Sequence, residues 1–298
     1  MQRLWIAATL IAAVAQTGRN AAQAGLTKTI GTAAATQVRF LFGLPFALMF
    51  LALVAGFGPD AVPPLTPRAV GFTAMGAVAQ IGGTAMMLRL MQSQSFAVTT
   101  AWLKTEPILL AIAAFAVLGD PLTLPTLLAI ALATAGVVVM TLKPGAASRL
   151  AQARPALAGL SAAFLFGLSA IGFRGGITAL DQGGFLIRAT TILCLSLALQ
   201  TAMLGLWMGL FDRKGLIASF RHWRGSVTAG FLGAFASQFW FIGFSLTTAA
   251  NVRTLALIDL VFAQMVSAWI FHQPTSRRQM AGMALIVAGV AVLLRSEI

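Results

Sequence analysis

Apolar stretches about 20 residues long follow one another along nearly the whole chain, and only short polar connections separate them. A helix needs about 20 mainly apolar residues to cross the hydrocarbon core of a bilayer. On this rule the sequence predicts an all-α polytopic membrane protein with ten transmembrane helices and no room for a globular domain. The predicted helices cover residues 4–24, 31–57, 68–91, 96–118, 122–142, 156–178, 184–211, 226–247, 250–272 and 277–295.

Composition excludes a soluble protein. Of the 298 residues, 59% are hydrophobic and 9% are charged, whereas soluble domains carry about 25% charged residues. The net charge of +13 lies on short loops, where basic residues orient helices and face anionic lipid rather than nucleic acid. The longest basic connections are 143–155 and 212–225, and the second predicts an interfacial helix. We therefore expect a multi-pass protein of the bacterial inner membrane, monomeric or homodimeric, with no nucleic-acid partner.

Sequence motifs of enzymes and ATP-driven pumps are absent. The chain contains neither HExxH nor GxxxxGK[ST], and no His lies within a predicted helix beside a nucleophile. The single Cys194 excludes an internal disulfide framework and a cysteine-based metal site. We expect no enzymatic activity, no cofactor and no bound metal.

The second half of the chain repeats the first. Residues 96–142, moved by 153 positions, align without a gap on 249–295, so that Glu106 falls on Asp259 and Gly136 on Gly289. Because each repeat of five helices is odd in number, the second repeat enters the membrane in the opposite sense. We predict repeats at 1–145 and 156–298 around a central cavity, an arrangement that places substrate near the bilayer midplane. A repeat preserved only as a structural scaffold is the alternative.

Two carboxylates, Glu106 and Asp259, lie about ten residues inside their predicted helices. Ionisable groups within a bilayer are costly and mark transport pathways, proton relays or buried ion pairs. The functional interpretation is a proton- or cation-coupling group, or an amine-binding group. The structural interpretation is a salt bridge that joins two helices.

Six cations also fall within or near predicted helices, and they outnumber the two carboxylates. They are Arg19, Arg39, Lys104, Arg174, Arg188 and Arg253. An anionic substrate would compensate this surplus, and extension of the side chain to the interface is the simpler solution. We expect the interface for Arg39, Arg174 and Arg188, and an anion-binding role for Arg19 and Lys104. Helical geometry places Lys104 on the side opposite Glu106, so its partner must lie elsewhere.

Further polar and aromatic side chains are candidates to line a cavity between the first, third, fourth, sixth, eighth and ninth predicted helices. Trp102 shares a helix face with Glu106, where Pro107 predicts a kink, and would form a stacking wall. The remaining candidates are Gln16, Asn20, Gln80, Gln238 and Trp240. For the glutamines, hydrogen bonding to a neighbouring helix is the structural alternative.

The two five-helix repeats, Pro107, the Gly119-Asp120 turn and the run AGVVVM at 135–140 resemble the EamA-type members of the drug/metabolite transporter superfamily. The resemblance implies a helical basket around a central cavity, and a secondary carrier that often exports amino acids or related metabolites. In that family the position of Asp120 is commonly Glu, and His272-Gln273 stands where the second repeat usually has an acid. An uncoupled facilitator, or a membrane scaffold or lipid-handling protein that transports nothing, remains as an alternative.

Overall fold

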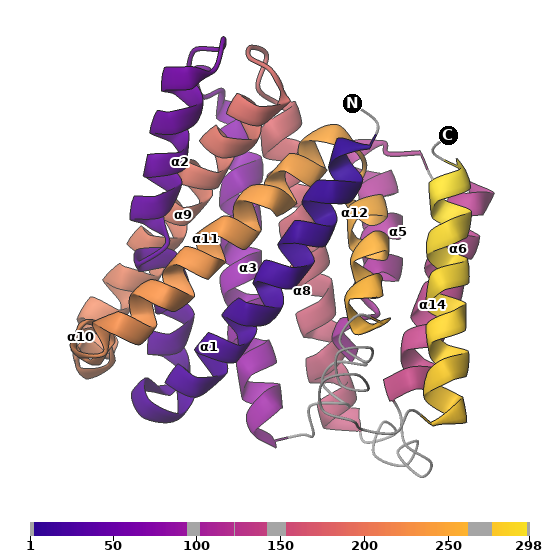
Figure 1. The fold of residues 1–298 in the computed structure, drawn as a ribbon. Helices are drawn as coiled ribbons and strands as arrows, with labels where there is room; N and C mark the ends of the chain where they lie inside the picture. The colour runs from indigo at the N-terminus through magenta and orange to yellow at the C-terminus, as the bar shows by residue number, and fades with distance from the viewer. Residues whose placement is uncertain (1–2, 94–101, 122, 142–152, 262–275, 297–298) are drawn as a thin grey trace.

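The computed structural model of the chain describes residues 3–93, 102–121, 123–141, 153–261 and 276–296, and these residues contain helices but no strand. The helices stand roughly side by side, and both chain ends lie at the same end of the bundle (Figure 1). The α-helices are α1 (Leu4–Leu41), α2 (Leu44–Phe57), α3 (Pro67–Ser93), α5 (Glu106–Leu118), α6 (Leu124–Thr141), α8 (Ala153–Thr178), α9 (Phe185–Phe211), α10 (Arg213–Arg221), α11 (Trp223–Leu246), α12 (Ala249–Leu255) and α14 (Arg277–Ser296). One 3-10 helix, η1, covers Ala256–Ile258.

Six helical segments in the described part of the chain are long and apolar enough to cross a membrane, and Glu106–Leu118 and Leu124–Met140 are shorter apolar helices. The six are Gly25–Phe57, Pro67–Leu90, Leu157–Thr178, Phe185–Phe211, Trp223–Leu246 and Arg277–Arg295. This all-helical, apolar architecture agrees with the multi-pass membrane protein that the sequence predicts.

Helix α1 is broken at Gly31, whose φ of 82° and ψ of 171° are accessible to glycine alone at low cost. A 2.8 Å hydrogen bond from Gln23 Nε2 to the carbonyl oxygen of Ala35 shows that the chain turns back here. In a straight helix these residues would lie about 18 Å apart along the axis. A second break follows at Phe42-Gly43, because Pro45 lacks the amide that would continue the helix. Residues 31–57 lie within one candidate membrane span, Gly25–Phe57, and the helix in it is interrupted at Phe42-Gly43.

The two segments that carry the predicted carboxylates are interrupted as well. Lys104-Thr105 forms a turn, and α5 begins at Glu106 with Pro107 in its first turn. Trp102 and Leu103 before this turn are helical, so the helix is interrupted next to Pro107, where the sequence predicts a kink. In the second half, α12 ends at Leu255 and η1 precedes Asp259. Residues 96–101 and 262–272 of the two predicted helices lie outside the described residues.

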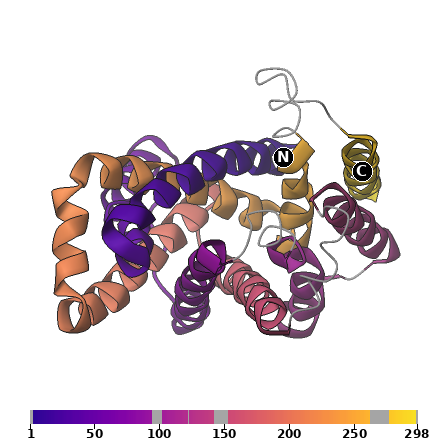
Figure 2. The same ribbon diagram turned by 90° about the horizontal axis from the view of Figure 1, so that it is seen from below.

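Close packing joins the helices in pairs: α1 with α11, α3 with α8, and α6 with α14. In the last pair a Cβ on Gly136 would lie 2.6 Å from the carbonyl oxygen of Gly282, and one on Gly289 would lie 2.7 Å from that of Ala129. Glycine at these positions lets the backbones touch, as small residues do between membrane helices. Seen from below, the α6–α14 pair stands at one edge of the bundle (Figure 2).

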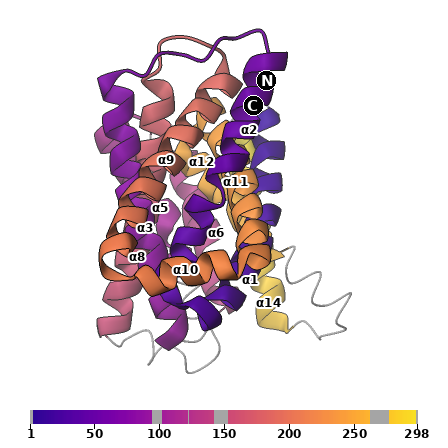
Figure 3. The same ribbon diagram turned by 90° about the vertical axis from the view of Figure 1, so that its left-hand side faces the viewer.

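Helix α10 runs across one end of the bundle, nearly perpendicular to the other helices (Figure 3). It lies within the predicted interfacial segment 212–225, with Ile217 and Phe220 exposed, as is the following Trp223. Basic side chains alternate with these apolar ones, as in helices that lie in the headgroup region. The local structure of this segment is as predicted.

Candidate functional site

A cavity of about 550 Å³ lies between α1, α3, α5, α8, α11 and the α12–η1 segment. This volume falls within the range of about 300–1,000 Å³ that is typical of small-molecule sites. These segments contain parts of the six predicted helices that the sequence analysis placed around a cavity, and Arg39 adds the second predicted helix, 31–57, which was not among them. Its charged lining residues are Arg19, Arg39, Lys104, Glu106, Arg253 and Asp259.

The two carboxylates form crossed ion pairs between α12–η1 and α5. Lys104, just before α5, places its Nζ 3.0 Å from both carboxylate oxygens of Asp259. Arg253 of α12 places its Nε 3.1 Å from Oε1 of Glu106. In each pair the side chains are between one tenth and one fifth exposed. Each half of the chain therefore neutralises the carboxylate of the other, and the partner that Lys104 required is Asp259.

The two pairs differ in how tightly they are held. Lys104 donates two hydrogen bonds, whereas Arg253 Nε and Glu106 Oε1 are at ion-pair distance without hydrogen-bond alignment. The Arg253 guanidinium instead stacks on Trp240, 4.5 Å from the ring centroid, and lies 5.5 Å from that of Phe244. Stacking holds Arg253 in place while leaving its charge exposed to the cavity. The Arg253–Glu106 pair is the more easily broken of the two.

Arg19 and Arg39 bring two further positive charges to the cavity wall, and each is 4% exposed. The expectation that Arg39 extends to the membrane interface is wrong. The breaks at Gly31 and Gly43 turn its segment back toward the first part of α1, so that both arginines lie against Gly233 of α11. Arg39 Nε has no hydrogen-bond partner among the described residues.

Amide and indole groups complete the polar lining. Trp240 Nε1 donates to Gln16 Oε1 at 3.0 Å, and both residues line the cavity. Gln80 also lines it and accepts a 2.8 Å hydrogen bond from Gln200 of α9. The side chain of Asn20 lies outside the described part of the structure.

Two predicted site residues lie away from the cavity lining. Gln238 is buried and donates to Thr190 of α9 at 2.8 Å, which is the structural alternative for a membrane glutamine. Trp102 packs against Gly159 of α8, where a Cβ would lie 2.5 Å from the Trp102 side chain. A stacking wall is instead provided by Trp240, which faces Arg253.

Arg174 and Arg188 are held by protein groups. Arg174 forms a two-point ion pair with Asp120 and also donates to the carbonyls of Phe244 and Thr247. Arg188 Nη1 donates to the carbonyl of Leu180 at 3.3 Å. Extension toward the interface is therefore not needed to stabilise Arg174, because its charge is paired within the bundle.

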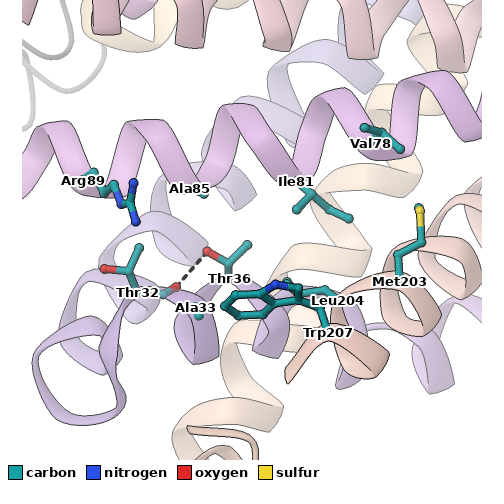
Figure 4. Close-up of a pocket in the computed structure, with 10 residues that line it drawn as sticks. All are labelled: Thr32, Ala33, Thr36, Val78, Ile81, Ala85, Arg89, Met203, Leu204 and Trp207. Carbon is teal, nitrogen blue, oxygen red and sulfur yellow. Dashed lines mark hydrogen bonds between the residues drawn. The ribbon is translucent and has the colours of Figure 1, made fainter. Parts of the chain in front are cut away.

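A second hollow of about 480 Å³ lies between α1, α3 and α9. Figure 4 shows Val78, Ile81, Leu204 and Trp207 along it, with Arg89 at one end. Arg89 is its one charged lining residue and Thr32 and Thr36 are its other polar ones, so this groove offers fewer polar groups to a small polar molecule than the first cavity does. Among the described residues no group of three or more His, Cys, Asp or Glu side chains could hold a metal ion.

Comparison with known proteins agrees with the fold and the apolar character of the chain. Residues 153–295 match the model of the EamA-like transporter family. Residues 153–295 therefore belong to the EamA-like transporter family. This EamA-like protein is thus a multi-pass membrane transporter of the drug/metabolite transporter type, and the family is not an enzyme family.

The matching solved structures extend the likeness over both halves. One of them, a crystal structure of a protein, has 18% sequence identity and a TM-score of 0.67, and the match covers 96% of this chain and 97% of that chain. At this identity the likeness is one of fold alone. No curated protein matches the sequence.

Sequence reasoning did not identify the roles of Arg253 and Arg39. Arg253 was placed near a helix start, so its pairing with Glu106 was not foreseen. The surplus of cations over carboxylates was the available signal for both. This surplus indicates that some of the positive charges must face a polar group, but it does not identify which of the basic residues do so.

Proposed function

We propose that the EamA-like protein is a secondary active transporter of a small polar metabolite such as an amino acid or organic acid. It would export this substrate across the bacterial inner membrane by alternating access, with a proton or cation as coupling ion. The observation that carries the proposal is the 550 Å³ cavity lined by six charged side chains from helices of both halves. Charges at membrane depth are costly, and a polar cargo is a reason to keep them there.

The proposed architecture is two inverted five-helix repeats, 1–145 and 156–298, with ten transmembrane helices in total. In its support, the helical interruption at residues 104–105 corresponds, at the offset of 153, to 257–258 within η1. Interrupted helices at the repeat interface are the usual place for substrate and coupling ions in such carriers. The crossed pairs join these two interruptions to each other.

The coupling step would use the weaker ion pair. Protonation of Glu106 cancels the negative charge that holds Arg253, which frees the α12 segment to move relative to α5. The Lys104–Asp259 pair, which has two hydrogen bonds, would keep α12 and α5 together during this step. The charge of the bound substrate would then take the place of the lost Glu106 charge. Transport would then depend on the pH difference across the membrane, whereas an uncoupled facilitator would not respond to it.

Reconstitution into proteoliposomes tests the proposal. Vesicles loaded with radiolabelled amino acids or organic acids are diluted into buffer, with and without an imposed pH gradient, and efflux is followed. Ser237→Trp, which places an indole in the cavity, should abolish efflux. Leu206→Trp is the matched control, because Leu206 is 68% exposed on α9. Lack of efflux for every compound by wild-type protein that binds one of them would refute the transport function.

A further inference from the structure

Helix α10 is packed against the bundle on one side and faces outward on the other. Gly215 and Ser219 are buried on the packed side, and the carbonyl oxygen of Ser219 accepts a 2.7 Å hydrogen bond from the hydroxyl of Ser226 on α11. The helix stands at the outer edge of the bundle, opposite the α6–α14 pair (Figure 2), and crosses the neighbouring helices there (Figure 3). Its other side is therefore directed at the surroundings of the protein.

The outward face of α10 combines basic and large apolar side chains. An α-helix turns by about 100° per residue, so five side chains fall within an arc of about 120° on the side away from the two buried residues. They are Arg213, Lys214, Ile217, Phe220 and Arg221. All five are exposed, Ile217 at 67% and Phe220 at 53%. Acyl chains would cover the two apolar side chains, and the three cations reach toward polar or anionic groups beside them.

The charge of this segment gives independent support. Residues 212–225 contain four basic residues and a single carboxylate, Asp212. That carboxylate caps the first turn of α10 by accepting a 3.0 Å hydrogen bond from the amide of Gly215. Among the described residues, no ion pair joins the basic side chains of α10 to a carboxylate. Arginine binds phosphate with two parallel hydrogen bonds, so phosphate groups outside the protein match this face.

We propose that the outward face of α10 is a binding site for anionic phospholipids, whose phosphates contact the three basic side chains and whose acyl chains contact Ile217 and Phe220. A soluble phosphate compound fits less well, because it would leave both apolar side chains in water. An acidic protein fits less well than lipid, because the adjoining Trp223 is 56% exposed and has Arg224 5.6 Å from its ring centroid. Exposed indoles beside cations are typical of the headgroup level of a bilayer. The site does not depend on the proposed transport function.

Delipidated protein in detergent provides the test. It is titrated with phosphatidylglycerol or phosphatidylcholine, and bound lipid is counted by native mass spectrometry. Wild-type protein should prefer phosphatidylglycerol. Each basic residue near an anionic lipid surface contributes about fivefold in affinity, so the triple change of Arg213, Lys214 and Arg221 to Gln should reduce this preference about tenfold or more. The matched control changes three exposed arginines on other segments, Arg68, Arg277 and Arg295, to Gln and should keep the preference. Equal losses in both triple variants, or equal binding of both lipids by wild type, would overturn the proposal.

A second variant separates a lipid from other anions and keeps all the charges. Ile217→Asn should weaken binding of phosphatidylglycerol about threefold or more, because apolar contact with the acyl chains is lost. It should not change the response to inorganic phosphate or to an acidic peptide, which serve as competitors. Neither competitor should displace bound phosphatidylglycerol from wild-type protein. Displacement by phosphate would show a site for soluble anions, and displacement by the peptide would show a protein-binding surface. Either result would refute the lipid site.

Discussion

Asp120→Asn tests the ion pair that joins three helices away from the substrate cavity. Arg174 Nε lies 3.0 Å from Asp120 Oδ2 and Nη2 lies 3.1 Å from Oδ1, while Nη1 donates to two carbonyls near the end of α11. Removing one member of a buried ion pair costs about 3–5 kcal/mol. Both side chains are mostly buried, at 16% and 13% exposed, and Arg174 keeps its carbonyl acceptors. We therefore expect a loss near the lower limit, about 3 kcal/mol.

In a chain of this size 1 kcal/mol lowers the unfolding temperature by about 2 °C, so Asp120→Asn should lower it by roughly 6 °C. The measurement is thermal unfolding in detergent, followed by tryptophan fluorescence. Asp181→Asn is the control, because Asp181 is exposed and shows no ion pair among the described residues. Asp120→Glu should recover most of the loss, since it keeps the carboxylate. A change below about 2 °C for Asp120→Asn would refute the assigned role.

Three other changes test the site and the helix packing. Glu106→Gln should abolish the pH dependence of efflux in vesicles while the protein remains folded; wild-type coupling in the purified variant would exclude this role. Lys104→Met and Asp259→Asn should each lower the free energy of unfolding in detergent by about 3 kcal/mol. The double variant should lose about 2 kcal/mol less than the sum of the two. Additive losses would mean that the pair contributes nothing. Gly136→Ala should destabilise the protein by about 1–3 kcal/mol, because the added Cβ meets the backbone of α14. Gly209→Ala is the control and should be neutral or stabilising, because nothing lies within 4 Å of its added Cβ. Equal losses for both variants would contradict the close packing of α6 against α14.

Much of the fold follows from the sequence because helix length and membrane thickness are tied by simple geometry. Helical geometry also showed that Lys104 needs a partner outside its own helix, but it did not identify that partner. Asp259 is 155 residues away, and helical periodicity does not determine which helices become neighbours. The structure supplies that neighbour relation, and with it the crossed arrangement of the two pairs.

Arg39 shows where hydropathy reasoning failed. Residues 31–57 are apolar enough to pass for one helix, and Arg39 then falls two turns from its end, where an arginine reaches water. Pro45 was a signal for the break at Gly43, but many membrane helices tolerate proline because neighbouring groups satisfy the freed backbone. Hydropathy alone cannot separate these outcomes, because both place the same residues at membrane depth.

Helix α10 has a mechanical consequence for how the cavity can open. Asp212 is the residue between α9 and α10, and His222 is the residue between α10 and α11, so neither junction contains slack. Asp212 also accepts a hydrogen bond from the amide of Gly215 at 3.0 Å, which anchors the first turn. Nine helical residues span about 14 Å, so α10 holds the C-terminal end of α9 and the N-terminal end of α11 at a constant distance. In a rocking motion of the kind proposed above, α9 and α11 would therefore move together at this end of the bundle.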